Sequence, residues 1–100
     1  MSEETKIKPK QIKIKVEVDE NLSGGTYCNL ILVNHSDSEF VLDGFFLQPQ
    51  KPAAKHGARL VLSPRSAKRL HQLLGNHLTK FEQLFGEIKL AGPKPPETFN

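Results

Sequence analysis

The chain has 100 residues and a formal net charge of +3, and 37% of its residues are hydrophobic while 25% are charged. This length accommodates one hydrophobic core, which excludes a deep cleft between two domains. No stretch approaches the roughly 18 consecutive apolar residues that cross a bilayer. The charged start MSEETKIKPK lacks the apolar region of a secretory signal, so we expect a cytoplasmic protein without a membrane segment.

Residues 1–10 show no periodicity and contain a proline between two lysines, which predicts a flexible leader. From residue 12 to residue 18, isoleucine and valine alternate with charged side chains. This period of two is typical of a half-buried strand. The loop at 19–25 ends in two glycines and can return the chain antiparallel. We therefore expect residues 12–18 to pair with the strand that follows.

The central feature is a hairpin. Two runs rich in β-branched and aromatic residues, 26–34 and 39–48, flank a turn rich in Ser and Asp. A three-residue loop between His35 and Glu39 would place Val33 opposite Val41. Gly44 lies inside the second run and is a candidate for a β-bulge.

This register sorts the hairpin side chains onto two faces, because successive side chains alternate across a strand. The predicted core face carries Cys28, Leu30, Leu32, Phe40, Leu42 and Phe46. The other face carries Tyr27, Asn29, Ile31, Val33, Val41, Asp43 and Phe45. The register sets Asn29 and Asp43 within reach of each other among large apolar groups, so we predict this second face to be a self-association or protein-binding surface.

The second half of the chain predicts an exposed connection at 49–57, a strand at 58–62 and a helix at 64–85. Ser63 is a good N-cap, Pro64 suits the first helical position, and Gly86 suits the C-terminal cap. Apolar residues recur at spacings of three and four along the helix. They are Ala67, Leu70, Leu73, Leu74, Leu78, Phe81, Leu84 and Phe85. Prolines in 91–100 predict a flexible tail.

These elements predict one α+β domain over residues 11–90. Its fold would be a four-stranded antiparallel β-sheet followed by one long C-terminal helix packed on one face, in the order ββββα. The helix stripe should pack on the face carrying Leu30, Leu32 and Leu42.

Four motifs lie along these elements: Tyr-x-Asn at 27–29, Glu-Phe-Val-x-Asp at 39–43, Ala-Lys-Arg-Leu at 67–70 and Phe-Glu-x-x-Phe-Gly at 81–86. Together with the leading alternating strand, they resemble an uncharacterised family of bacterial proteins of about this length, catalogued as a domain of unknown function. The resemblance implies the fold and a bacterial origin, but no activity and no site residues. The order of strands before a long helix is also similar to SecB-type export chaperones, at the level of topology alone.

The sequence offers no nucleophile elbow, phosphate loop, dinucleotide fingerprint or closely spaced metal ligands, so we expect no enzyme activity and no cofactor or metal. Asp43 would be a structural hydrogen-bonding group or a functional carboxylate. A run without acidic residues is a candidate anion-binding cluster or a solvated basic face. It comprises Lys55, Arg59, Arg65, Lys68 and Arg69.

Apolar groups on both faces of the hairpin predict a non-enzymatic, self-associating protein-binding module, because one helix covers only one face. A second copy is the simplest partner, which gives a dimer or higher homo-oligomer. Surplus apolar surface would hold client segments in a chaperone-like manner. The alternative is a small nucleic-acid-associated regulator that uses the basic cluster at 55–69.

Overall fold

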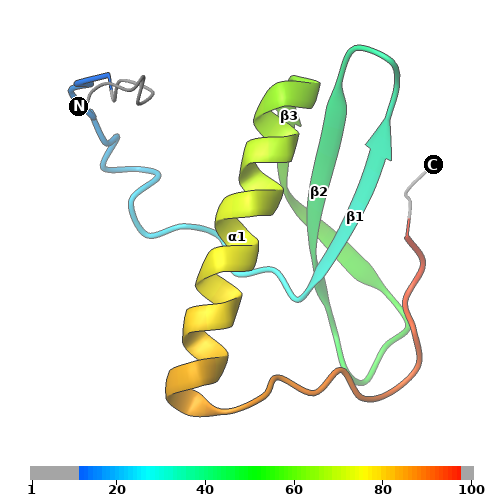
Figure 1. Cartoon of the computed structure of the whole chain (residues 1–100). Coiled ribbons are helices and arrows are strands. Elements are labelled where there is room, and N and C mark those ends of the chain that lie inside the picture. The colour runs from blue at the N-terminus through cyan, green and yellow to red at the C-terminus, as the bar shows by residue number, and fades with distance from the viewer. Residues whose placement is uncertain (1–11, 98–100) are drawn as a thin grey trace.

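The computed structural model describes residues 12–97, and the leader expected at residues 1–10 lies outside this range. Within it, three strands precede one helix: β1 (Leu30–His35), β2 (Phe40–Leu47), β3 (Ala54–Leu62) and α1 (Pro64–Phe85) (Figure 1). The strands form one antiparallel sheet in the order β1-β2-β3. The expected α+β class, with one helix after the sheet, is confirmed. The sheet has three strands (βββα) where four were expected.

Residues 12–18 pair with no strand in this structure, which corrects the expected first strand. Their isoleucine and valine side chains are 69–79% exposed. The loop at 19–25 is closed by its own hydrogen bonds, from Leu22 N to Asp19 O and from Gly25 N to Leu22 O, and does not lay the segment on β1. Alternating apolar and charged side chains favour an extended conformation. A β-strand forms only where a neighbouring backbone supplies hydrogen-bond partners.

The β1–β2 hairpin is shifted by one residue from the predicted register. His35 pairs with Phe40 and Val33 with Leu42, so the loop is 36–39 and not the three residues expected. The hydroxyl of Ser36 accepts hydrogen bonds from the N–H groups of Ser38 and Glu39, both at 3.2 Å. Ser36 N also donates to Glu39 O at 2.9 Å. These bonds close a four-residue loop, and the extra residue moves every later pair by one position.

The shift exchanges side chains between the two faces of the sheet. We call the side toward α1 the helix face, which carries Ile31, Val33, Phe40, Leu42, Leu60 and Leu62. The other side is the carboxylate face, which carries Leu30, Leu32, Val41, Asp43, Phe45, Arg59 and Val61. The two predicted faces were therefore wrong as sets. The helix lies over Leu42 as expected, but Leu30 and Leu32 point to the opposite side.

The bulge lies next to Gly44, in the pairing of β2 with β3, but its extra residue is in β3 and not at Gly44 as expected. Gly44 pairs with Ala58 and Phe45 with His56, so Gly57 is an extra residue in β3. β3 begins at Ala54, earlier than predicted, because pairing with β2 continues across a stretch whose own composition favours a loop.

Helix α1 begins and ends where the sequence predicts. The Ser63 hydroxyl accepts from Ser66 N at 3.1 Å, and Pro64 occupies the first turn. Gly86 ends the helix with a φ of 102°, a conformation that favours glycine, and its N–H donates to Glu82 O. No α1 side chain is buried, however. The apolar stripe of α1 therefore lies beside the sheet but stays accessible to solvent.

The segment after α1 runs back along the outer edge of β1 (Figure 1). Val33 N donates to Glu97 O at 3.0 Å, which satisfies one backbone group of that edge. In the described part of the chain, no helix has both the length and the apolar character to span a membrane.

Candidate functional site

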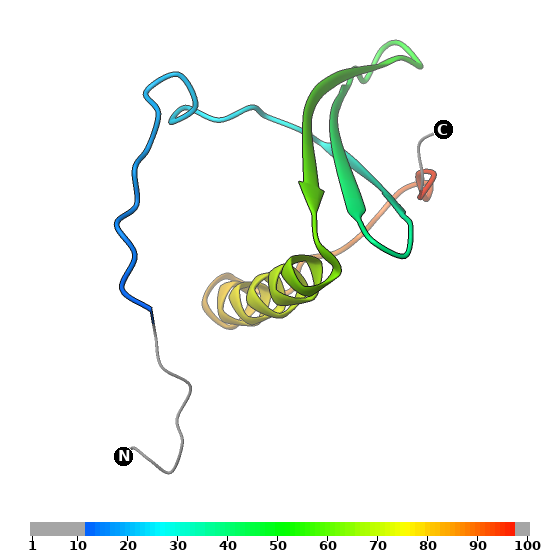
Figure 2. The same cartoon turned by 90° about the horizontal axis from the view of Figure 1, so that it is seen from above.

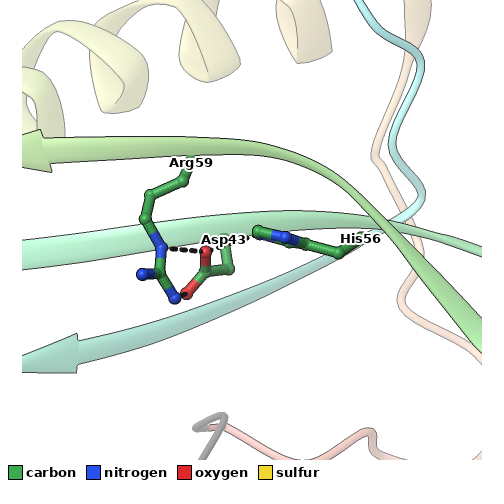
Figure 3. Close-up of polar contacts among 3 residues, drawn as sticks. All are labelled: Asp43, His56 and Arg59. Atoms are coloured by element: carbon green, nitrogen blue, oxygen red, sulfur yellow. Dashed lines mark hydrogen bonds and ion pairs between the residues drawn. The ribbon is translucent and has the colours of Figure 1, made fainter.

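The most enclosed polar group of the sheet is the carboxylate of Asp43 in the middle of β2, which is 1% exposed. Arg59 Nε donates to its Oδ1 at 2.7 Å, and Arg59 Nη2 donates to its Oδ2 at 3.2 Å. His56 Nε2 lies 2.7 Å from Oδ1 and donates, because an ionised carboxylate only accepts. Figure 3 shows the two side chains converging on Asp43 from β3. We call this group the Asp43 triad.

The bulge in β3 assembles the triad. Arg59 lies directly opposite Asp43 in the ladder. His56 and Arg59 are three residues apart, and in a regular strand they would point to opposite faces. The extra residue Gly57 reverses the alternation, so His56 shares the carboxylate face and packs at a tilt against the ring of Phe45, with ring centroids 4.9 Å apart. The sequence interpretation missed His56 because it placed this residue in an exposed connection at 49–57, whereas β3 begins at Ala54.

The triad links β2 to β3 through the ion pair and hydrogen bonds that Asp43 makes with Arg59 and His56. The hydrogen bonds from Arg59 hold the pKa of the Asp43 carboxyl below its usual value; burial opposes this, and His56 adds to the lowering. The pairing with Asp43 also raises the pKa of Arg59. Arg59 and His56 are themselves 50% and 43% exposed, so the carboxylate is covered by its own partners and not by a deep core. An anionic carboxylate held this way is a poor proton acceptor.

Asp43→Asn is expected to make stability less dependent on acid pH. The folded-state pKa lies below the unfolded value of about 3.9, so the ionised carboxylate contributes stability above that pH. The contribution is lost as the pH falls through the folded-state pKa. Urea unfolding midpoints between about pH 7 and pH 2 should fall less steeply for the variant. They should also start lower at neutral pH, because the Arg59 ion pair is gone.

The matched control is Asp37→Asn in the exposed hairpin loop, which should keep the acid profile of the wild type. Identical profiles for Asp43→Asn and Asp37→Asn would contradict the assignment of the acid sensitivity to the triad.

A groove about 560 Å³ in volume separates the first half of α1 from the helix face of the sheet. Its walls are apolar, with Lys68 and His71 among the lining residues. The principal lining side chains are Val33, Phe40, Leu42, Ala67, Leu70 and Leu74. Farther along the helix, Leu74 also borders a second hollow of about 400 Å³ with Leu78, Phe81 and Ile88. An apolar hollow therefore follows α1 over much of its length.

The seven residues predicted as one association face do not share a surface. Ile31 and Val33 lie on the helix face, whereas Val41, Asp43 and Phe45 lie on the carboxylate face. Asn29 contacts the backbone of Leu47 and not Asp43: its Nδ2 donates to Leu47 O at 3.0 Å, and its Oδ1 accepts from Leu47 N at 2.6 Å. The ring of Tyr27 packs edge-on against Phe46. Only Val33, of these seven, lines the groove beside α1.

The predicted anion-binding cluster is also divided. Arg59 is paired with Asp43, and Lys55 lies opposite Phe46 toward the far end of β3. Arg65, Lys68 and Arg69 line a shallow depression on the first turns of α1. Among residues 12–97, no three His, Cys, Asp or Glu side chains gather in a geometry that could hold a metal ion.

Comparison with known proteins identifies one family. A family model described as "Protein of unknown function (DUF3467)" matches residues 1–90, which include the sheet and the whole of α1. No curated protein and no solved structure matches the chain.

Proposed function

The chain belongs to the DUF3467 family of proteins of unknown function, and from that premise we propose that it is a non-enzymatic, self-associating protein-binding module. The surface proposed for self-association is the groove beside α1 together with the exposed apolar stripe of that helix. The occupant proposed for it is a second copy of the same chain. The observation that carries the proposal is how little apolar surface the single chain buries.

Within residues 12–97, the buried apolar side chains are Leu32 and Phe45. Both lie on the carboxylate face, so the helix face and α1 contribute no buried side chain where they meet. A domain of this size needs most of its large aliphatic groups out of water to offset the conformational entropy lost on folding. The apolar stripe of α1 therefore needs another surface to remove it from water.

The exposed area supports a covering as large as another protein. The chain exposes 9366 Å², whereas a compact monomer of this length exposes roughly 5,700 Å². The extended segment at 12–18 accounts for part of the excess. The exposed apolar side chains of α1, which include Leu73, Leu74, Leu78, Phe81, Leu84 and Phe85, follow most of the length of this 22-residue helix. A small-molecule ligand would cover only part of such a stripe.

A second copy fits this surface because each copy carries both a hollow and a ridge. The groove lies at the first half of α1, and the C-terminal end of the helix presents the highly exposed apolar side chains of Leu84 and Phe85. A two-fold axis places the ridge of each copy near the hollow of the other, which makes one patch self-complementary. The alternative of a nucleic-acid regulator gains no support, because the predicted basic cluster is divided.

The test is the mass in solution of a double variant, Leu70→Glu with Leu74→Glu, measured by light scattering over a concentration series. Both side chains line the groove, and glutamates there would place charges in an apolar contact. We expect the dissociation constant to rise by at least about 100-fold. Helical circular dichroism should be retained, because both positions are already exposed in the single chain.

Gln72→Glu is the control, since it adds a negative charge midway between positions 70 and 74, but on the side of α1 that carries Arg65 and Arg69. It should leave the assembly unchanged. A wild-type chain that scatters as a monomer at every accessible concentration would overturn the proposal.

A further inference from the structure

The strongest strand pattern of the sequence lies on a segment that has no partner in the sheet. Ile12, Ile14, Val16 and Val18 form one apolar side of this segment, and all four are exposed. The segment lies on the β3 side of the molecule and runs in the direction opposite to β3, as Figures 1 and 2 both show. Such a segment has the chemistry of a strand that completes a neighbouring sheet.

The outer edge of β3 is the matching acceptor. β3 ends the order β1-β2-β3, so no described strand lies on its far side. All of its residues except Leu62 are exposed along its length. The opposite edge, at β1, already donates a backbone hydrogen bond from Val33 N to Glu97 O. A long exposed edge of this kind is a template for pairing with another strand.

We propose that residues 12–18 of one copy form a fourth, antiparallel strand on the outer edge of β3 of a second copy. This proposal rests on the self-association proposed above and names one of its contacts. The strand addition would complete the four-stranded sheet that the sequence pattern predicts. It would also place the apolar side of the segment on the helix face, toward the uncovered stripe of α1.

Side-chain chemistry selects the register of this pairing. With Glu17 opposite Arg59, Val16 lies opposite Leu60 and Ile14 opposite Leu62, so opposite charges meet on the carboxylate face and apolar groups meet on the helix face. A shift of two residues in one direction sets Lys15 opposite Arg59. A shift of two in the other direction carries Ile14 past the end of β3. Both alternatives lose pairs that the proposed register forms.

The chain between residues 19 and 28 directs the segment toward another copy. Thr26 and Cys28 pack closely against the sheet, since an ideal Cβ on Gly57 would lie 3.0 Å from Thr26 Cγ2 and one on Gly44 would lie 2.5 Å from Cys28 Sγ. On the N-terminal side of Thr26, the turns at 19–25 are held by hydrogen bonds among their own residues. One of these runs from Asn21 N to Asp19 Oδ1 at 2.8 Å. The turns project residues 12–18 away from the sheet of their own chain, where the edge of a second copy can receive them.

Disulfide trapping between differently labelled chains tests the proposal. In a Cys28→Ser background, one chain carries Lys15→Cys and the other carries Val61→Cys, two positions that the register sets directly opposite each other on the carboxylate face. Mixing the two chains under mild oxidation should give a cross-linked heterodimer as the main product on a non-reducing gel. Lys13→Cys mixed with Val61→Cys is the control, on the same face but two residues out of register, and should cross-link at least about 5-fold less.

A chain carrying both Lys15→Cys and Val61→Cys separates the two connectivities. Formation of a cross-linked monomer by this chain, with no cross-linked heterodimer from the mixture, would overturn the proposal in favour of pairing within one chain. Equal cross-linking by the Lys13→Cys control would overturn the register. If the wild type is dimeric by light scattering and no cross-link forms, the strand addition is wrong while the proposed self-association stands.

Discussion

Phe45→Ala is expected to lower the free energy of unfolding by about 3–5 kcal/mol, the range for removing a buried aromatic side chain. Phe45 is 5% exposed, lies opposite Leu30 in the ladder and packs against the His56 ring. Leu32 is the other buried apolar side chain of the described residues. Few apolar groups can therefore shift to fill the cavity that the Phe45 ring leaves. Urea unfolding followed by circular dichroism, at one fixed protein concentration, measures the loss.

Phe46→Ala provides the matched control, since Phe46 is the next residue of β2 and is exposed. Its effect should be well under half that of Phe45→Ala. Phe45→Leu keeps the measurement possible if the alanine variant fails to fold, and it should cost under about 1.5 kcal/mol. Equal losses for the alanine variants at 45 and 46 would show that the carboxylate face holds no core.

The second large effect is expected from Gly44→Ala, at about 1–3 kcal/mol, the usual cost of overpacking. Gly44 pairs with Ile31 and Ala58 inside the sheet, and a Cβ there would lie 2.5 Å from Cys28 Sγ and 3.2 Å from Cys28 Cβ. The thiol would have to move for the methyl group to fit. The destabilisation should appear in urea unfolding at fixed concentration.

A double-mutant cycle with Cys28→Ala isolates the cause. Removal of the sulfur relieves the closer of the two contacts, so the loss caused by Gly44→Ala should shrink by roughly half or more in that background. Gly75→Ala in α1 is the control, because no side chain and no other element of the fold lies within 4 Å of the ideal Cβ of Gly75. It should be neutral or slightly stabilising, given the higher helix propensity of alanine. Additive effects of the two changes at 28 and 44 would contradict the steric explanation.

The sequence alone determined the elements whose signals are local. The helix from Pro64 to Phe85 begins at a serine cap and ends at a glycine, and both caps act within one turn of the residues that they stop. The α+β class and the resemblance to a family of unknown function also followed from patterns within short windows, and the family match over residues 1–90 confirms the latter. The alternation of residues 12–18 was visible in the same way, but the prediction that this segment is a half-buried strand was wrong.

Only the tertiary structure decided which residues meet across the sheet. One hydroxyl, that of Ser36, closes a four-residue loop, and this single residue of difference sends Val33 to the helix face and leaves Val41 on the other. One extra residue, Gly57, brings His56 to Asp43. Which residues pair across two strands depends on how many residues lie in the loop or bulge between them. One residue more or fewer there changes every later pair, although the local sequence pattern of each strand stays the same.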